Sequence, residues 1–442
     1  MSETLKTLYG QHVEERRATT ARALAETGYD RLLVGSGRPF TYFADDNDAP
    51  FHPTPHFAHW TPLDGPGHVL EVVPDRRPRV VRVVPRDYWY EPPSPAPEFV
   101  RELFDVIDVD SPEAAWKEIS PNGRTAFLGG NGEDAKAAGL SPEDVNPKPL
   151  VARLDWERSY KSEYELRSMA EASSRAAAGH IAAREAFRGG ASEIEAHHAY
   201  LTAIGGMEEG LPYPTIIGLD ERASTLHYHG KRGQQASPGH VMLIDAGATV
   251  RGYGSDITRT YARETAHPIF LRLLAGVDAL QRRLAADARP GLPYLDLHLK
   301  AHRYIAELLV ECAILRVPAD QAYERGLTRP FFPHGLGHFL GIQVHDVAGK
   351  QADREGTPAP PPETHPYLRT TRVIEERQLF TIEPGLYFIP MLLEPYRTGA
   401  DAGAFDWELV DALTPFGGIR VEDDVYVGAG ANRNLTREVL PD

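Results

Sequence analysis

The sequence predicts two domains: a smaller N-terminal α/β domain over residues 1–155, and a larger α+β domain over residues 156–442 in which helices pack on a curved antiparallel sheet. Three observations support this. A chain of 442 residues exceeds what one hydrophobic core usually organises. Helical and strand-like segments alternate through the first part of the chain, which is typical of an α/β domain. The sequence NPKP at residues 146–149 then interrupts this alternation shortly before a long segment of helical composition.

The N-terminal domain is expected to begin with a helix over residues 3–27, which has helical spacing and many charges. A short strand over residues 29–35 follows a glycine turn. Residues 67–73 and 79–84 flank the sequence PDRRP and predict a hairpin, and residues 124–129 predict another strand.

A long helix over residues 157–187 is expected to open the second domain, because this stretch is rich in Ala, Glu, Arg and Ser and has no proline or glycine before Gly179. Strands are predicted over residues 240–262, and helices over residues 267–288 and 294–315. A strand-rich segment should begin near residue 373.

Composition narrows the class of partner and compartment. The formal net charge of -16 argues against a nucleic acid or an anionic membrane as partner, since both attract basic patches. Cys312 is the single cysteine and lies among apolar residues, so a buried structural thiol in a reducing compartment is expected. Residues 1–25 do not resemble a signal peptide, and no apolar run is long enough to span a membrane. These features predict a cytoplasmic protein.

Four carboxylates and one histidine of the second domain stand in short strand-like or loop motifs. They are Asp245 in LIDAG, Asp256 in GSDIT, His338 in HGLGH, Glu383 in TIEPG and Glu422 in RVEDD. An unpaired carboxylate is costly to bury, and the usual remedies are a partner or a metal ion. This set of side chains therefore suits a site for two divalent ions.

The two aspartates are expected on the arms of one hairpin. If its loop centres on Val250 and Arg251, Asp245 and Asp256 face each other about 5 Å apart. Two like charges at that distance would repel strongly without a cation. For either aspartate alone, a turn cap or a solvated position on an edge strand is the simpler alternative.

Glu383 ends a predicted strand, and alternation along residues 418–422 places Arg420 and Glu422 on the same face of another. If Glu422 binds metal, Arg420 must point toward the same cavity. A lone buried acid is the alternative for Glu383, and an ion pair along the strand is the alternative for Glu422.

Residues 331–346 contain His334, His338 and His345 among glycines and aromatic residues. The glycines between the first two histidines argue against a helix and for an irregular loop whose backbone is bent to aim them. Three histidines in one such loop favour a functional site.

These motifs resemble the bacterial proline dipeptidases (prolidases) of the pita-bread metallopeptidase group, which also contains aminopeptidase P and methionine aminopeptidase. The likeness runs over roughly residues 160–430 and is weaker in the N-terminal part. It implies a pita-bread fold for the second domain. It also implies that Asp245 binds one ion, that Asp256 and Glu422 bridge two ions, and that His338 and Glu383 complete the shell of the second.

The resemblance implies roles for other residues as well. It assigns Tyr213 and His227 to the pocket, Arg369 to the free carboxylate of the substrate, and His334, His345 and Arg420 to substrate and transition-state contacts. Asp45 and Trp89 lie in segments similar to those that reach the partner's active site in a homodimer, although a solvated loop and a core position are the simpler alternatives for them. His229 departs from the family pattern.

The implied activity is hydrolysis of Xaa-Pro dipeptides by a hydroxide that bridges two metal ions, with manganese as the first candidate and cobalt or zinc as substitutes. Glu383 would carry the proton to the leaving nitrogen, and His345 or His227 would stabilise the oxyanion. Phosphotriester hydrolysis is an implied side activity. The alternatives are an aminopeptidase P-type enzyme and a non-catalytic pita-bread protein that binds a peptide or a protein.

Overall fold

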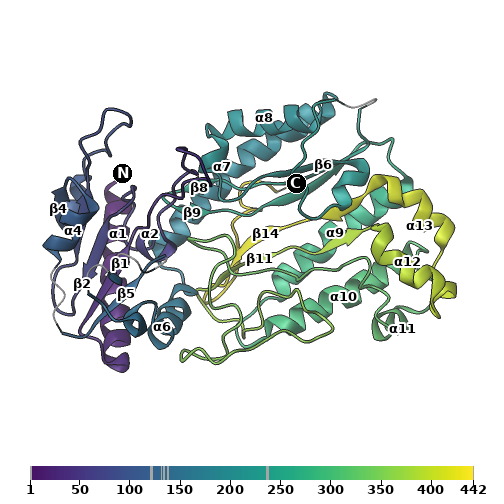
Figure 1. Cartoon of the computed structure of the whole chain (residues 1–442). Coiled ribbons are helices and arrows are strands. Elements are labelled where there is room, and N and C mark those ends of the chain that lie inside the picture. The colour runs from purple at the N-terminus through teal and green to yellow at the C-terminus, as the bar shows by residue number, and fades with distance from the viewer. Residues whose placement is uncertain are drawn as a thin grey trace. The chain divides into compact units, whose positions relative to one another are not determined.

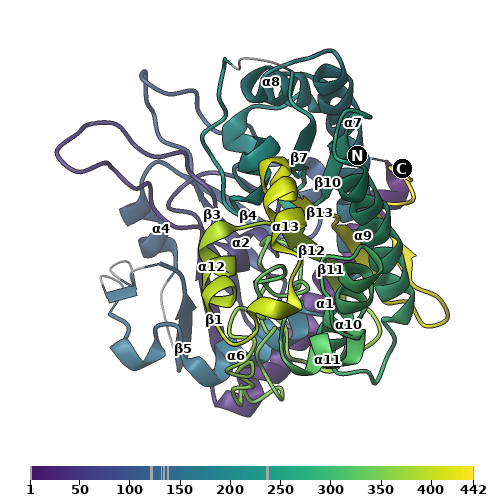
Figure 2. The ribbon, with the colours of Figure 1, turned by 90° about the vertical axis from the view of Figure 1, so that its right-hand side faces the viewer.

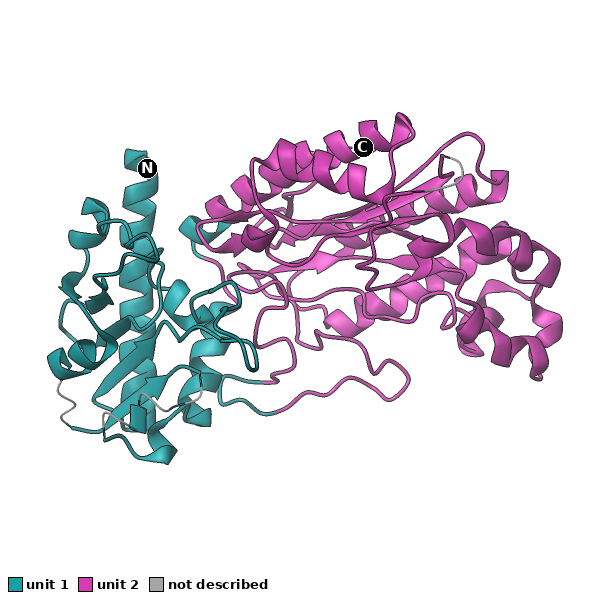
Figure 3. Cartoon of the chain, turned by 45° about the horizontal axis from the view of Figure 1, so that its top comes forward, with its two compact units in different colours: residues 1–158, 162–166, 353–357 teal, residues 159–161, 167–352, 358–442 magenta. Residues whose placement is uncertain are grey.

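The computed structural model describes the chain except for residues 1, 120–122, 131, 133–134, 137–138, 235–237 and 442. The chain divides into two compact units, coloured separately in Figure 3. Unit 1 comprises residues 1–158, 162–166 and 353–357, and unit 2 comprises residues 159–161, 167–352 and 358–442. The chain therefore passes between the units more than once.

Unit 1 is built on a five-stranded mixed sheet with strand order β4-β3-β2-β1-β5. Its strands are β1 (Arg31–Gly35), β2 (Val69–Val72), β3 (Arg79–Val83), β4 (Asp105–Val109) and β5 (Thr125–Leu128). Its described helices include α1 (Glu3–Thr27), α2 (Pro55–Ala58), α3 (Glu98–Arg101), α4 (Pro112–Glu118) and α6 (Lys148–Arg158), with a 3₁₀ turn at Pro142–Asp144. The predicted first helix, the β2–β3 hairpin and the strand near residue 125 are confirmed.

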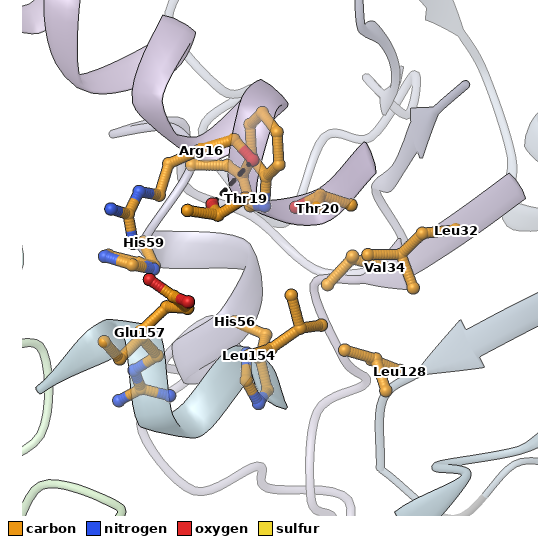
Figure 4. A pocket seen from close by; sticks show the side chains of 12 residues that line it. Arg16, Thr19, Thr20, Leu32, Val34, His56, His59, Leu128, Leu154 and Glu157 are labelled. Atoms are coloured by element: carbon orange, nitrogen blue, oxygen red, sulfur yellow. Dashed lines mark hydrogen bonds between the residues drawn. The ribbon is translucent and has the colours of Figure 1, made fainter. Parts of the chain in front are cut away.

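A small cavity lies in unit 1 between α1, β1 and α6. Figure 4 shows Arg16 and Thr19 of α1, Leu32 of β1 and Leu154 of α6 around it. Its volume is about 20 Å³, which is room for about one water molecule. This cavity is therefore too small to bind a peptide.

The single helix predicted over residues 157–187 is wrong at its start. Helix α6 ends at Arg158, and α7 (Glu163–Arg188) begins at Glu163. The backbone N–H and the hydroxyl of Ser162 donate to the Glu165 carboxylate at 2.9 and 3.0 Å, and the Glu165 N–H donates back to the Ser162 hydroxyl at 3.4 Å. This reciprocal pair is a capping box, which starts a new helix.

Unit 2 is an α+β unit. Besides α7, its helices include α8 (Glu193–Ile204), α9 (Pro268–Asp287), α10 (Tyr294–Glu311), α11 (Ala319–Glu324), α12 (Pro390–Thr398) and α13 (Trp407–Leu413). The 3₁₀ turns include Glu208–Gly210, Asp220–Ser224, Ala402–Ala404 and Thr414–Phe416. The strands are β6 (Ile216–Leu219), β7 (Val241–Asp245), β8 (Thr249–Val250), β9 (Tyr253–Gly254), β10 (Thr258–Ala262), β11 (Leu379–Ile382), β12 (Gly385–Tyr387), β13 (Gly418–Arg420), β14 (Asp423–Tyr426) and β15 (Arg433–Asn434).

Antiparallel pairing links β6, β7 and β10, links β12 with β13, and links β11, β14 and β15. Figure 2 shows β7, β10, β13, β12 and β11 in succession across the unit. Helices α7 and α8 pack on β6 and β7, whereas α9 and α10 pack on β11, β12 and β14, with the strands between the two helix pairs in Figure 1. The predicted packing of helices on antiparallel strands is confirmed.

The hairpin with the two predicted aspartates has a different register from the expected one. Asp245 pairs with Thr258, not with Asp256. The turn is centred on Arg251 and Gly252, whose φ angles of 55° and 86° are both positive. Two-residue hairpin loops favour this left-handed conformation, because it matches the twist of the strands. The predicted turn is therefore one residue too early.

Among the described helices, none has both the length and the apolar composition needed to cross a bilayer. Cys312 is a free thiol at the C-terminal end of α10, where it is 2% exposed. Burial raises the pKa of this thiol, which makes it a poor nucleophile. The expectation of a buried thiol is confirmed.

Candidate active site

A cavity of about 1080 Å³ opens in unit 2. Its wall includes all eleven site residues predicted in the second domain: Tyr213, His227, Asp245, Asp256, His334, His338, His345, Arg369, Glu383, Arg420 and Glu422. Cavities of this size accommodate small organic ligands. The structure therefore gathers residues from widely separated motifs around a space large enough for a dipeptide.

The sheet places one row of site residues. Asp245 on β7 pairs with Thr258 on β10, and Thr258 forms a bridge with Glu422. The Thr258 hydroxyl donates to the Glu422 carboxylate at 2.6 Å and accepts from Arg420 Nε at 3.2 Å. Residues directly opposite in neighbouring strands carry their side chains on the same face, so the ladder itself brings Asp245 and Glu422 to one wall.

A second row comes from the HGLGH loop, which runs along β11. The Thr381 N–H donates to the His338 carbonyl at 2.9 Å, and the Glu383 N–H donates to the Leu336 carbonyl at 2.8 Å. A Cβ at Gly337 would lie 2.0 Å from the Thr381 carbonyl oxygen, so only glycine allows this approach. The predicted irregular loop is confirmed, and the glycine brings His338 beside Glu383.

The ligand atoms of Asp256, His338 and Glu422 lie within 4.8 Å of one another. His338 Nε2 is 3.3 Å from Asp256 Oδ2 and 3.6 Å from Glu383 Oε1. The other ring nitrogen, Nδ1, is 3.0 Å from the Phe339 carbonyl oxygen. A hydrogen bond of this kind orients the ring and leaves Nε2 for the carboxylates or for a metal ion.

The raised pKa values of three of the acids show that nearby positive charge does not fully compensate the buried carboxylates. Burial raises the pKa of Asp245, raises that of Glu422 well above its usual range and raises that of Glu383 to about 7. Burial alone would lower the pKa of His338, but the hydrogen bond to Asp256 and the charges of Glu383 and Asp256 raise it to about 9. A proton on His338 thus partly neutralises the site.

A divalent ion fits these residues. The donors are carboxylate oxygens and one imidazole nitrogen, a set that suits hard or borderline cations. Asp245 Oδ1 is buried and has no hydrogen-bond partner in the part of the chain that the structure describes. A bound cation would relieve both this unpartnered oxygen and the repulsion between the carboxylates.

The metal-free protein is expected to lose stability as the pH rises from about 5 to about 9. The folded-state pKa values of Glu383 and His338, about 7 and about 9, lie above their usual values of 4.5 and 6.5. Stability from such a group is present below the unfolded pKa and is lost as the pH rises through the folded pKa. Urea unfolding in EDTA and in Mn²⁺ tests this: the decline should disappear with metal, and a flat profile in EDTA would contradict it.

Arg420 is buried and fully engaged within the site. Its Nη2 donates to Asp245 Oδ2 at 2.6 Å and its Nη1 donates to the Tyr387 hydroxyl at 2.9 Å. The Tyr387 hydroxyl also lies 2.9 Å from His334 Nε2. Arg420 therefore forms its ion pair with Asp245 on another strand. The alternative, an ion pair with Glu422 along the same strand, is not formed.

Arg369, His227 and His345 are exposed on the cavity wall. Within the described residues, Arg369 has no ion-pair partner, which leaves its guanidinium available to a ligand.

Partial desolvation and the charge of His338 lower the pKa of His345 to about 4. Burial and the charges of Asp245 and Asp256 raise the pKa of Tyr213 well above its usual range. His229, the departure from the family pattern, also lines the cavity.

The two acids that follow Glu422 are buried but do not line the cavity. Asp423 pairs with Arg259 and Arg437, each at 2.8 Å. Asp424 accepts the Asp256 N–H at 3.2 Å, and burial raises its pKa well above the usual range. These two acids therefore stabilise the backbone next to Glu422 and Asp256 without facing the cavity.

Asp45 and Trp89 belong to unit 1 and lie on exposed loops. Trp89 is 75% exposed, so the alternative that it is a core residue is wrong. Neither residue lines the cavity of unit 2, and their role in a partner's site stays a prediction.

The sequence motifs did not indicate Thr258 and Tyr387, which connect Arg420 to the rest of the site.

Comparisons with known proteins agree with this geometry. The chain matches metallopeptidase family M24 over residues 167–429 and the N-terminal domain of Xaa-Pro dipeptidases over residues 7–156. It is 41% identical to the Xaa-Pro dipeptidase of Pseudoalteromonas atlantica over 99% of both chains. It is also 41% identical to that of Stenotrophomonas maltophilia K279a, over 97% of this chain and 96% of the relative. The N-terminal similarity is thus stronger than the sequence motifs indicated.

Among solved structures, aminopeptidase P from E. coli with the inhibitor Pro-Leu is similar at a TM-score of 0.73 and 24% identity, over 97% of this chain and 95% of that one. The Zn-substituted enzyme with product gives a TM-score of 0.74 at 23% identity, with the same coverage. At this identity the likeness concerns the fold alone. The predicted pita-bread fold is confirmed.

Proposed function

This chain belongs to metallopeptidase family M24, and we propose that it is a metal-dependent exopeptidase that hydrolyses dipeptides with a C-terminal proline. The observation that carries the proposal is that Asp245, Asp256, His338, Glu383 and Glu422 all line one cavity, where burial raises the pKa of Asp245, Glu383 and Glu422. Full-length similarity to Xaa-Pro dipeptidases supports the substrate class.

We propose that these five side chains hold two divalent ions, most simply Mn²⁺, with Co²⁺ or Zn²⁺ as substitutes. Asp245 would bind the first ion, Asp256 and Glu422 would bind both, and His338 and Glu383 would complete the second. When bound, the ions would activate water as a nucleophile and polarise the carbonyl group before proline.

The surrounding side chains would move the proton and stabilise charge. Glu383 is 3.3 Å from the Thr381 hydroxyl and faces His338, a position from which it would take the proton of the attacking water. It would deliver this proton to the proline nitrogen, which carries no hydrogen in the peptide. His345 and His227 would donate hydrogen bonds to the oxyanion, and the lowered pKa of His345 keeps its ring neutral at pH 7.

The mouth of the cavity suits a dipeptide. Arg369 offers a guanidinium for the terminal carboxylate, which Arg420 cannot do while it holds Asp245 and Tyr387. Leu226 and Ile389 add apolar surface for the proline ring. His334 and Tyr213 would help to position the substrate.

Hydrolysis of Leu-Pro by the Mn²⁺-loaded protein, compared with longer peptides that begin Leu-Pro, tests the proposed activity. We expect the dipeptide to be preferred. A preference for the longer peptides would instead support an aminopeptidase P-type enzyme. No hydrolysis of either with Mn²⁺, Co²⁺ or Zn²⁺ would support a non-catalytic peptide-binding protein.

Replacing Arg369 by leucine is expected to raise KM for Leu-Pro about 10- to 100-fold with a smaller change in kcat, because a hydrogen bond to a charged group contributes about 1.5–3 kcal/mol. Leu-Pro amide lacks the carboxylate, so R369L should barely affect its hydrolysis. The exposed Arg272 on α9 provides the control variant R272L. Equal losses on Leu-Pro and on its amide would show that Arg369 does not bind the carboxylate.

We extend the proposal to three properties that the resemblance implies. The same water nucleophile would hydrolyse phosphotriesters, and this activity should disappear together with peptidase activity in E383Q.

The exposed aromatic side chains of unit 1, including Phe43 and Trp89, would contact a second copy of the chain in a homodimer. Light scattering measures the molar mass that decides this. The single cysteine supports a cytoplasmic location.

A further inference from the structure

Three histidines of unit 2 form a cluster outside the active site. His298 and His302 lie one turn apart on α10, and His365 comes from the segment before Leu368. We call these three residues the imidazole trio. Their ring centroids are 4.6 to 4.8 Å apart, and one ring nitrogen of each lies within 4.8 Å of the others.

The trio has nitrogen lone pairs to offer. His298 Nε2 and His365 Nδ1 are 3.0 Å apart and share one proton. His302 Nε2 is buried and has no hydrogen-bond partner among the described residues. Burial, followed by the charges of neighbouring groups, lowers the pKa of His298 to about 2 and that of His302 to about 3. The rings are therefore neutral at pH 7, which is the form that binds metal.

We propose that the imidazole trio binds one divalent transition-metal ion of the Zn²⁺ type. Such an ion lies about 2.0–2.1 Å from each nitrogen, so two tetrahedral ligands are about 3.3 Å apart. The spacing of 3.0 Å between His298 and His365 is already close to this value. On binding of the ion, the proton between the two nitrogens would move to the other nitrogen of its own ring, which keeps that histidine neutral. The three ligand nitrogens lie within 4.8 Å of one another, so that of His302 would have to come closer by at most about 1.5 Å to complete the set.

The surroundings select the class of ion. The Arg329 guanidinium lies near enough to lower the pKa of His302 and of His365, after the larger effect of burial. The charge of Arg329 opposes binding that depends on electrostatic attraction, as for Mg²⁺ or Ca²⁺. Neutral imidazoles bind Zn²⁺, Ni²⁺ and Cu²⁺ well, so the trio should prefer these ions.

Neighbouring side chains prepare the site. His302 Nδ1 is 2.8 Å from the Thr328 hydroxyl, a contact that orients the ring and leaves Nε2 available for an ion. An adjacent cavity of about 190 Å³, lined by His365 and Phe332, has room for a water molecule as the fourth ligand.

The trio is separate from the proposed catalytic ions. The Phe332 ring packs against both His302 and His334 of the active site, with ring centroids 5.0 and 4.9 Å away. His365 also lies close in sequence to Arg369, which lines the active-site cavity. An ion bound by the imidazole trio would therefore link the segment that contains His365 and Arg369 to helix α10.

Anomalous diffraction from crystals of the full chain, grown with Mn²⁺ and then exposed to Zn²⁺, tests the proposal directly. Data above and below the zinc edge should show a zinc peak between the three rings. Absence of a peak there, at zinc concentrations that fill the carboxylate site, would overturn the proposal. This measurement needs no variant, so it does not depend on how a substitution folds.

Zinc content per chain after desalting provides the second measurement. H302Q and H365N should each bind one zinc ion fewer than the wild type, whereas H198N, which removes an exposed histidine of α8, should bind the same number. Equal zinc content in the wild type and both trio variants would contradict the proposal. The difference concerns only the trio, so a failure of the catalytic metal proposal would leave it unchanged.

Discussion

Replacing Asp256 by asparagine is expected to lower kcat/KM for Leu-Pro by about 10³-fold or more and to remove at least one metal ion per chain. The substitution keeps the shape of the side chain but removes the negative charge of the carboxylate, whose Oδ2 lies 3.3 Å from His338 Nε2. A catalytic ion contributes several kcal/mol to the transition state, and each 1.36 kcal/mol changes the rate tenfold. Steady-state kinetics in Mn²⁺ and elemental analysis of the same samples measure both effects.

Asp424 offers a matched control next to the same site. It is buried, its pKa is raised well above the usual range by burial, and it accepts the Asp256 N–H without lining the cavity. The D424N variant keeps the size of the side chain and an oxygen that can accept the Asp256 N–H, so it should change kcat/KM only a few-fold. Full activity of D256N, or activity of the wild type after removal of metal by a chelator, would show that this carboxylate does not serve a metal centre.

Sequence patterns predicted most elements of the fold but not their exact limits. Hydrophobic spacing and turn residues placed α1, the β2–β3 hairpin, α9 and α10. The break before α7 was missed, because helix-forming composition masked the capping pair of Ser162 and Glu165, although its S-x-x-E pattern is visible in the sequence. The turn was predicted one residue too early, and the β7–β10 pairing was therefore wrong by two residues. Arg251 and Gly252 adopt the positive φ angles of the turn, a conformation that the arginine side chain does not itself favour, so the residue types did not reveal it.

The site could be predicted where a motif combines an acid or histidine with an apolar run or with glycines. All eleven residues of unit 2 predicted from these motifs line one cavity. Thr258 and Tyr387 could not be found in this way, since a threonine and a tyrosine in strands are ordinary core residues. Thr258 does lie two residues after Asp256, and only the ladder between Asp245, Thr258 and Glu422 reveals its place between the acids.

Replacing Arg420 by methionine is expected to lower the free energy of unfolding of the metal-free protein by about 3–5 kcal/mol, the usual cost of breaking a buried ion pair by removing one partner. Arg420 is 5% exposed and Asp245 is 9% exposed, and their 2.6 Å contact would be lost. The pKa of Asp245 is already raised by burial, and the charge of Arg420 is the main factor that opposes this shift. Urea unfolding at pH 7 in EDTA measures the loss.

Metal ions should reduce this loss, and the reduction distinguishes a metal ligand from an ordinary buried acid. If Asp245 binds an ion, that ion supplies the positive charge that the introduced methionine side chain lacks, so R420M should be destabilised less in Mn²⁺ than in EDTA. Arg31 provides the comparison, because it is also buried and pairs with the buried Glu71 at 2.8 Å within unit 1. R31M should lose similar stability under both conditions. An R420M variant that is equally destabilised with and without Mn²⁺ would mean that Asp245 depends on Arg420 alone, and the first metal position would then have to be assigned elsewhere.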